Sequence, residues 1–524
     1  MNATSPNRKD KGNQPPPITA FTPVLRHAMA QWHTRNAITF YRHNLPETEL
    51  TFAQLCRHID RFAGHLSGLG VAKGARVILF LEKSLIFIIA HLAVQQLGAV
   101  SVPLNPGFKK REMAYLLKDA DPVLVITNPD KSDLIQTIDQ KYRRLAISTR
   151  TPFQALHFSH AETARSVPHD FSPDDPALII YTSGTTGDPK GAVLTQGNLL
   201  HDAANIIRNW DIRKTDRICH ALPLFHVHGL CFALHTALLG GAQTCLLDRF
   251  DPEFVLDLLA DCDVNSACTV FMAVPAMYAK MTARMASCPM KFEHVRLLAS
   301  GSAPLLAQEF ERIKTYFGME PLEREGMSET GMNFSNPLKG TRKPGSIGKP
   351  LPHVSVRIVD PETLKDVTGN HIGEIWLKGP GITPGYWQKP EETRQAFKDG
   401  WFRTGDLGKI DEDGYFYLTD RIKHIIITGG ENVSAKEVET VINQMDHIVE
   451  SSVVGIPDEK WGEQVVAAVV TDSETSLDAG RIQSFCKEHL HDWKCPKQIR
   501  FIDEIPRNTM GKVLKESVKQ LFIA

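Results

Sequence analysis

One turn constrains the fold of this chain more than any other feature: residues 181–192, Tyr-Thr-Ser-Gly-Thr-Thr-Gly-Asp-Pro-Lys-Gly-Ala. The apolar run Ala177–Ile180 before it is typical of a buried strand. Glycines let backbone N–H groups point at an anion, while hydroxyls and a lysine add donors and charge. The common P-loop does not fit, because Lys190 is followed by Gly191 instead of Ser or Thr. Many such turns are merely flexible, but this one is long, follows a strand and carries a late lysine. We therefore interpret it as a polyphosphate-binding turn.

Before the turn at 181–192, strand-like and helix-like patterns alternate along the sequence. Apolar strands are predicted at 77–81 and 123–127, with an apolar helix between them that ends near Leu97. Thr51 and Gln54 form a capping-box pattern before an amphipathic helix. This alternation predicts an α/β fold with helices on the faces of its sheets. A length of 524 residues predicts at least two domains.

Composition excludes several classes of function. The formal net charge is −1, so nothing draws the whole chain to nucleic acid or to an anionic membrane. Nine cysteines without a C-x-x-C pair predict reduced thiols and a cytoplasmic protein. Residues 1–17 are polar and end in three prolines, so we expect a disordered tail and no signal peptide. The most apolar run, 85–94, is too short to span a bilayer.

A histidine-rich stretch, residues 222–230, is the next candidate for chemistry. His226 and His228 are two residues apart, so on a strand both would face one side. Such a pair can bind a metal ion, but His220 is the only further ligand nearby. We therefore favour packing or polar contacts over a metal site.

The turn at 181–192 closely resembles the ATP-binding signature of the adenylate-forming superfamily, which includes acyl-CoA synthetases, firefly luciferase and the adenylation domains of peptide synthetases. Residues from about 20 to 520 resemble this superfamily, with motifs in its usual order. The resemblance implies a large N-terminal domain at 18–421 and a small mobile α+β domain at 422–524. Further stretches that resemble superfamily motifs lie at 98–106, 295–304, 326–330, 401–407 and 506–515.

The resemblance also implies a set of nucleotide-binding residues. Glu329 and the hydroxyl of Thr185 would bind Mg²⁺, which prefers such oxygen ligands; without the resemblance, Glu329 would be read as a solvated carboxylate. Asp406 would accept hydrogen bonds from the ribose hydroxyls, although alone it would be read as a turn aspartate. The superfamily usually has an aromatic residue where Glu325 stands, so adenine stacking must come from elsewhere. The implied ATP- and AMP-binding residues are Thr182, Ser183, Gly184, Thr185, Thr186, Gly187, Lys190, Gly301, Ser302, Ala303, Glu325, Gly326, Met327, Ser328, Asp406 and Arg421.

The resemblance implies catalytic and mobile residues as well. Lys512 matches the lysine that stabilises the transition state of adenylation. Lys423 takes the place of the hinge residue, and Gly429-Gly430 would help to admit CoA. Lys512, Glu329, Thr185 and His226 are the residues that we expect to be catalytic.

The acyl pocket implied by the resemblance contains His226, Lys280, Gly301 and Met332. The His-Val-His-Gly stretch resembles malonyl-CoA synthetases, and the lack of an aspartate at His226 argues against an amino acid substrate. In those enzymes an arginine at the position of Lys280 binds the distal carboxylate of the substrate. The lysine in this sequence keeps the positive charge, but it lacks the planar guanidinium that binds a carboxylate through two hydrogen bonds. Two hypotheses follow: Lys280 pairs with a second carboxylate, or it points to solvent and the pocket takes a plain acyl chain.

The predicted function is an acyl-CoA synthetase that uses ATP, Mg²⁺ and CoA on a small carboxylic acid. A fatty-acid or aryl-acid CoA ligase is the main alternative. A peptide-synthetase module would need a carrier domain, and the sequence stops at Ala524, soon after the lysine motif. A luciferase-like oxygenase shares these motifs, whereas a non-catalytic binding protein should have lost Lys512 or Glu329.

Overall fold

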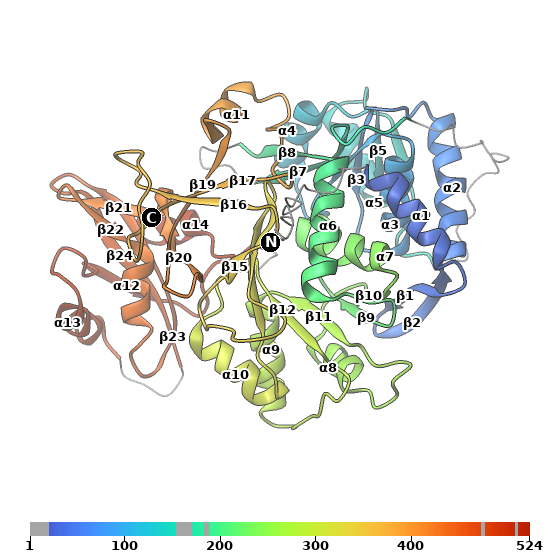
Figure 1. Ribbon diagram of the computed structural model, residues 1–524. Coiled ribbons are helices and arrows are strands. Elements are labelled where there is room, and N and C mark those ends of the chain that lie inside the picture. The colour runs from blue at the N-terminus through green and yellow to red at the C-terminus, as the bar shows by residue number, and fades with distance from the viewer. Residues whose placement is uncertain (1–19, 154–169, 183–187, 473–476, 509–511, 524) are drawn as a thin grey trace, which may run out of the picture.

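The computed structural model describes residues 20–153, 170–182, 188–472, 477–508 and 512–523. Its larger part contains three β-sheets, and a smaller C-terminal part with one sheet adjoins it (Figure 1). The expected tail at 1–17 lies outside the described residues.

The largest sheet has nine strands, in the order β15-β14-β13-β12-β11-β9-β10-β1-β2. Strands β13, β12, β11, β9, β10 and β1 are parallel to one another, while β2, β14 and β15 pair antiparallel. Their bounds are β1 Asn36–Arg42, β2 Leu45–Thr51, β9 Arg217–His220, β10 Gln243–Leu247, β11 Val270–Ala273, β12 Leu297–Ser300, β13 Leu322–Met327, β14 Gly331–Ser335 and β15 Lys349–Pro350.

The second sheet has six strands in the order β6-β5-β3-β4-β7-β8, all parallel except for β8. Its antiparallel pair β7–β8 carries the phosphate-binding turn that we predict from the sequence. The bounds are β3 Arg76–Phe80, β4 Val100–Pro103, β5 Leu124–Thr127, β6 Arg144–Ala146, β7 Pro176–Thr182 and β8 Lys190–Thr195.

Helices cover these sheets, and one of them lies wholly inside. Every residue of α3 is buried, because the helix packs in one continuous core with side chains from both sheets. The helices of the larger part are α1 Phe21–Gln31, α2 Phe52–Gly68, α3 Leu85–Gln96, α4 Lys110–Ala120, α5 Pro129–Ile138, α6 Gln196–Trp210, the π-helix η2 His228–His235, α7 Thr236–Gly240, α8 Pro252–Ala260, α9 Pro275–Met285, α10 Ala307–Phe317 and α11 Pro390–Ala396.

A third sheet leads from the larger part into the C-terminal part. It pairs β16 Ser355–Val359, β17 Gly373–Lys378, β18 Phe397–Lys398, β19 Trp401–Ile410 and β20 Phe416–Arg421. A short 3₁₀ helix, η3 Ile422–His424, follows. The C-terminal part contains β21 Ile425–Thr428, β22 Glu431–Ser434, α12 Ala435–Ile442, β23 Ile448–Asp458, β24 Gly462–Thr471, α13 Ala479–His489, β25 Gln498–Phe501 and α14 Lys515–Ile523.

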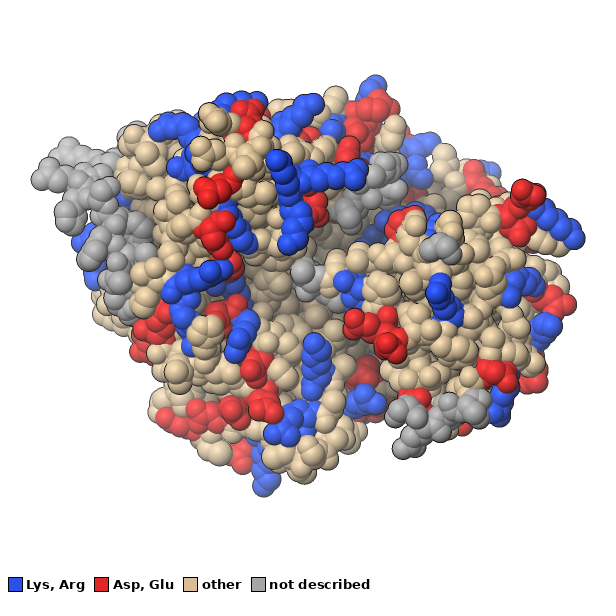
Figure 2. Space-filling model, turned by 180° about the vertical axis from the view of Figure 1, so that it is seen from behind, with Lys and Arg blue, Asp and Glu red and all other residues tan. Residues whose placement is uncertain are grey.

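The structure confirms the predicted mixed α/β architecture. The Thr51–Gln54 capping box is formed at the start of α2. Within the described residues, no helix is both long enough and apolar enough to cross a membrane. Seen from behind, a groove runs between the two parts, and charges of both signs are interspersed over the described surface (Figure 2).

Candidate active site

The β7–β8 hairpin brings the phosphate-binding turn to Glu329. Thr182, the last residue of β7, is paired in register with Lys190, the first residue of β8. The Thr182 hydroxyl donates to Glu329 Oε1 at 3.3 Å. Ser183, Gly184, Thr185, Thr186 and Gly187, which belong to the predicted clamp, lie outside the described residues.

A half-buried tyrosine, Tyr386, also holds Glu329. The Tyr386 hydroxyl donates to the same Oε1 at 3.2 Å, and the Lys190 ammonium lies 5.5 Å from the centroid of the Tyr386 ring. The second oxygen, Oε2, has no hydrogen-bond partner among the described residues. Glu329 is thus a buried carboxylate that is fixed through Oε1, and no described residue forms a hydrogen bond to its Oε2.

Asp406 and Arg421 form an ion pair across neighbouring strands. They face each other in the register of β19 and β20, and Arg421 Nε lies 2.5 Å from Asp406 Oδ1. Burial raises the pKa of Asp406, and the positive charges of Arg421 and Lys512 oppose that shift. The pair holds the carboxylate in place at the boundary between the two parts of the molecule.

Lys512 reaches this boundary from the C-terminal part. Its backbone is tied into a small loop, because the Lys512 N–H donates to Asn508 Oδ1 at 3.0 Å. Burial lowers the pKa of its ammonium to about 8, helped by Arg421 and Lys423, while Asp406 and Glu329 raise it. Lys512 is therefore within electrostatic reach of both carboxylates of the predicted nucleotide site.

The predicted hinge and CoA-binding residues follow immediately along the chain. Lys423 is an exposed residue of η3, next to the Asp406–Arg421 pair. Gly429 and Gly430 form the β21–β22 turn, where both have positive φ, 60° and 84°. Glycine adopts this left-handed conformation without steric cost. A Cβ on Gly429 would also lie 2.9 Å from the Trp461 ring.

The histidine stretch is not a strand, so the strand geometry that we considered for His226 and His228 is wrong. Pro223 is followed by a turn, and His228 begins the π-helix η2. Burial lowers the pKa of His226 to about 4, so its imidazole is neutral near pH 7. The His228 ring lies deeper, with Nδ1 3.1 Å from the Ser302 hydroxyl. π-Helical turns are frequent at functional sites.

Gly301, Ser302 and Ala303 follow β12 and lie beside an arginine that the sequence analysis did not single out. Ser302 has φ 69°, a conformation that is uncommon outside glycine. Gly301 leaves room for the side chain of Arg324, since a Cβ there would lie 2.5 Å from Arg324 Nε.

Arg324 is a buried charge to which no described residue forms a hydrogen bond. Its side chain comes from β13, is 2% exposed and lies 5.1 Å from the centroid of the Phe232 ring. Nε, Nη1 and Nη2 all lack hydrogen-bond acceptors among the described residues. Burial lowers the pKa of the guanidinium to about 10, so it stays positive near pH 7. Buried groups of this kind require an explanation, because an unpaired charge is costly.

Two carboxyl groups lie within electrostatic reach of Arg324. Asp202, on α6, accepts the Met332 N–H through Oδ1 at 2.8 Å. Glu325 accepts from the Asn333 amide at 3.0 Å, and burial raises its pKa to about 7. Gly326 packs tightly on β14, while Met327 and Ser328 are half-buried residues that lead to Glu329.

A cavity of about 730 Å³ lies between the two parts of the molecule. Phe225, Val274 and Met277 form part of its apolar wall, and Asn508 lines it from the C-terminal part. Lys280 also lines this cavity and is exposed. Lys280 is therefore exposed to solvent, whereas Arg324 is buried.

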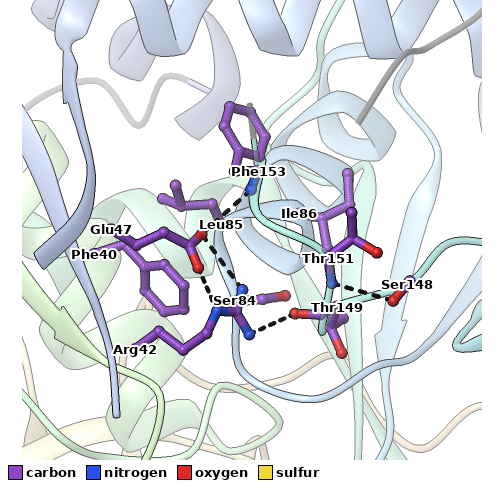
Figure 3. Close-up of a pocket in the computed structure, with 10 residues that line it drawn as sticks. All are labelled: Phe40, Arg42, Glu47, Ser84, Leu85, Ile86, Ser148, Thr149, Thr151 and Phe153. Carbon is purple, nitrogen blue, oxygen red and sulfur yellow. Dashed lines mark hydrogen bonds and ion pairs between the residues drawn. The ribbon is translucent and has the colours of Figure 1, made fainter. Parts of the chain in front are cut away.

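A second pocket, shown in Figure 3, is too small for a substrate. It has a volume of about 10 Å³, roughly enough for one water. The Arg42–Glu47 ion pair crosses it, Arg42 donates to the Thr149 carbonyl at 2.8 Å, and the Phe153 N–H donates to Glu47 at 3.3 Å. These contacts tie the β1–β2 hairpin to the loop at 148–153.

Sequence reasoning missed Tyr386 and Arg324. Tyr386 stands in the stretch Gly385-Tyr-Trp387, where no neighbouring residue in the sequence points to a contact with Glu329. Arg324 immediately precedes Glu325, and an arginine between two glutamates looks like an exposed strand residue. The sequence of β13, Leu-Glu-Arg-Glu-Gly-Met, contains no signal that its arginine is buried.

Comparison with known proteins agrees with this geometry. The AMP-binding enzyme family matches residues 25–387, and the AMP-binding enzyme C-terminal domain matches residues 437–512. The indoleacetate–CoA ligase of Aromatoleum aromaticum is 35% identical over 91% of this chain and 94% of its own length. The mitochondrial malonate–CoA ligase of Mus musculus is 34% identical over 95% and 91%. The ATP-bound crystal structure of MatB from Rhodopseudomonas palustris is 36% identical, with a TM-score of 0.87 over 96% of this chain and 99% of that one. The chain therefore belongs to the AMP-binding enzyme family and is an acyl-CoA synthetase of the adenylate-forming type.

Proposed function

We propose that this acyl-CoA synthetase activates a short dicarboxylic acid, malonate or a close analogue. The acid would react with ATP to give an acyl-adenylate and pyrophosphate, and CoA would then displace AMP to give the thioester. The observation that carries the choice of acid is the buried Arg324 guanidinium, which has no hydrogen-bond partner among the described residues.

A second carboxylate on the substrate would satisfy Arg324. The planar guanidinium presents donors in a fork that matches a carboxylate, and such charge-assisted pairs are strong. His228 and Ser302, which lie beside the same pocket, are neutral hydrogen-bonding groups near pH 7, because burial holds the pKa of His228 well below its usual value. The malonate–CoA ligase of Mus musculus and the MatB structure among the relatives support this choice of acid.

The proposed first half-reaction joins the remaining carboxylate to the α-phosphate. A carboxylate oxygen attacks phosphorus, and the bond to the pyrophosphate oxygen breaks. The Lys512 ammonium, close to Asp406 and Glu329, would stabilise the negative charge that develops on the reacting oxygens. Asp406, held by Arg421, would accept hydrogen bonds from the ribose. His226 would line the acyl side, and Ser302 would lie between the acid and the nucleotide.

The clamp completes this arrangement in our proposal. Thr182 and Lys190 would bind the phosphates from the ends of β7 and β8, together with the turn at 183–187. Gly301, Ala303 and residues 325–328 would surround the adenine, with no aromatic side chain at Glu325 to stack on it.

The residues around Glu329 fit a magnesium ion. The available ligand is a hard carboxylate oxygen, Oε2, because the hydroxyls of Thr182 and Tyr386 both donate to Oε1. Glu329 would hold the ion, with the Thr185 hydroxyl as a second ligand. A bound magnesium would neutralise charge on the phosphates of ATP.

The second half-reaction requires the C-terminal part to turn. We propose that residues 18–421 and 422–524 are the two domains, and that rotation about Lys423 withdraws Lys512 after adenylation. The Gly429-Gly430 turn would then face the site and admit the CoA thiol. The sulfur attacks the acyl carbon, AMP leaves, and the thiol proton passes to solvent.

All nine cysteines are free thiols in the structure. Free thiols persist in reducing compartments, which supports our proposal that the enzyme works in the cytoplasm.

A longer or aromatic monocarboxylic acid is the second candidate. The cavity of about 730 Å³ between the two parts has the volume for such an acid, and Phe225, Val274 and Met277 make part of its wall apolar. The indoleacetate–CoA ligase among the relatives supports this alternative.

AMP release with and without CoA, measured for malonate, butyrate, octanoate, benzoate and palmitate, tests the proposal. We expect malonate to give the highest kcat/KM and turnover to require CoA. A preference for any acid that has only one carboxylate would contradict the proposal and favour the second candidate.

A further inference from the structure

Asp202 is a buried carboxyl group on α6, which packs against β14. It projects from α6, where its Oδ1 accepts the Met332 N–H at 2.8 Å. Gly331, with φ 69°, packs directly on it, since a Cβ there would lie 2.8 Å from Oδ1. Asp202 therefore fixes the start of β14 at Met332, one of the predicted acyl-pocket residues.

Among the described residues, Arg324 is the one positively charged neighbour of Asp202. On β13, the charged neighbours of Asp202 are Arg324 and Glu325. On β14, Met332 supplies an N–H, and the strand contains no titratable side chain. From η2, burial keeps the Cys231 thiol protonated by raising its pKa, and it keeps His228 neutral by lowering its pKa. His201, beside it on α6, is also neutral near pH 7, because burial lowers its pKa to about 4.

The two carboxyl groups near Arg324 differ in their surroundings. Glu325 is held by the Asn333 amide and interacts with Asp406 and Arg421, on the nucleotide side. Asp202 interacts with Met332 and Arg324, on the acyl side. Asp202 is therefore the carboxyl group that a second substrate carboxylate at Arg324 would meet.

We propose that Asp202 is a specificity-determining residue, which serves as the counter-charge of Arg324 in the free enzyme and takes up a proton when a dicarboxylic acid binds. The inference rests on the proposed function. One buried guanidinium cannot offset a substrate carboxylate as well as Asp202 and Glu325, because like charges held close together disfavour each other's ionised forms. Protonation of Asp202 removes the repulsion and keeps its Oδ1 bond to the Met332 N–H.

The burial of Asp202 sets the pH range of the effect. Burial raises its pKa to about 7, so near pH 6 most of the free enzyme already carries the proton. Above that pKa the proton must be taken from solvent, and apparent affinity for the diacid should fall about tenfold per pH unit. Carboxylic acids of ordinary pKa are ionised throughout this range. A monocarboxylic acid does not place a second charge there and should bind without this dependence.

Asp202→Asn tests the proposal, because it removes the charge but preserves the side-chain shape and the Oδ1 acceptor. We would measure KM and kcat for malonate and butyrate between pH 6.5 and 8.5. In the wild type, KM for malonate should rise at least tenfold across this range. In Asp202→Asn it should stay within about threefold, with KM at pH 8.5 below that of the wild type.

Glu323→Gln is the matched control. Glu323 is also buried, and it also accepts a backbone N–H, from Leu305 at 3.1 Å. It precedes Arg324 on β13 and so points to the opposite face of the strand. This variant should keep the wild-type pH dependence of KM. Calorimetry of malonate binding in buffers with different ionisation enthalpies should give uptake of about one proton for the wild type at pH 8 and none for Asp202→Asn.

Failures of the two proposals give different results. If the wild type turns over malonate but Asp202→Asn keeps the same rise of KM with pH, the role of Asp202 is wrong and the dicarboxylate function stands. If the wild type activates butyrate and not malonate, both proposals are overturned.

Discussion

Buried charges have different surroundings in the two halves of this active site. The nucleotide half contains Glu329, Asp406, Arg421 and Lys512, and the acyl half contains Asp202, Lys280 and Arg324. In the nucleotide half, Asp406 is paired with Arg421, and Glu329 accepts hydrogen bonds from Thr182 and Tyr386. In the acyl half, all three nitrogens of Arg324 lack a hydrogen-bond partner among the described residues. The protein holds the first set of groups in place by hydrogen bonds, whereas the described residues offer Arg324 only the charges of Glu325 and Asp202 and no hydrogen bond.

This difference distinguishes the binding of ATP, which the family shares, from the choice of acid, which we propose is particular to this chain. Internal pairing preorganises Asp406 and Glu329 for ATP, the substrate common to these enzymes. An unpaired buried guanidinium costs stability in the free protein, and a substrate that pairs with it recovers that cost on binding. On this view, ATP chemistry is built into the paired half, and the choice of acid depends on the unpaired charge.

The largest effect should come from Lys512 in the nucleotide half. Lys512→Ala removes the charge beside Asp406 and Glu329, so adenylation should fall by on the order of a hundredfold or more. The same variant should still convert supplied acyl-adenylate and CoA into thioester. Pyrophosphate release and thioester formation, measured separately, check this. Equal losses in both would mean that Lys512 does not act in adenylation alone.

The pH dependence of adenylation tests the same group without mutation. Burial lowers the pKa of Lys512 to about 8, so the ammonium is present below pH 8 and is lost above it. At saturating ATP and acid, the adenylation rate should fall to about half by pH 8 and then fall towards tenfold per pH unit. A rate that stays level to pH 9.5 would show that the charge on Lys512 is not required.

A hinge variant should affect the two half-reactions unequally. Lys423→Pro fixes φ and removes an N–H at the proposed hinge. Thioester formation should fall about tenfold more than adenylation, because only the second step requires the C-terminal part to turn. Single-turnover measurements of each step check this, and proportional losses would argue against a hinge at Lys423.

The smallest effect should come from the exposed cation of the acyl half. Lys280 lines the cavity but is exposed, and exposed charges contribute little. Lys280→Met should raise KM for malonate by about threefold and leave butyrate unchanged. A tenfold or larger rise would make Lys280 the main partner of the second carboxylate.

Much of the fold and of the nucleotide half follows from local sequence. The Thr51–Gln54 capping box and the apolar run at 177–180 form the predicted helix start and strand, because caps and short buried strands depend on adjacent residues. Glu329 and Asp406 stand in ordered motifs that can be recognised one at a time. Their meeting with Lys512, from the other end of the chain, depends on packing between distant segments.

The acyl half could not be predicted in the same way. Arg324 and Asp202 are 122 positions apart, and each looks like an ordinary surface residue of a strand or a helix. Only the packing of α6 against β14, with Gly301 and Gly331 leaving room, buries them in one pocket. The strand geometry considered for the histidine stretch failed because Pro223 and the turn after it lead into a π-helix.

The most direct test of the account compares the unpaired arginine with the paired one. We would measure kcat/KM for malonate and for butyrate in the wild type, in Arg324→Met and in Arg421→Met. Loss of one partner of a buried charge pair costs about 3–5 kcal/mol. Arg324→Met should therefore lose activity on malonate by a hundredfold or more, keep activity on butyrate, and melt no lower than the wild type. Arg421→Met should reduce activity on both acids by the same factor. An unchanged malonate-to-butyrate ratio in a folded Arg324→Met enzyme would contradict the account.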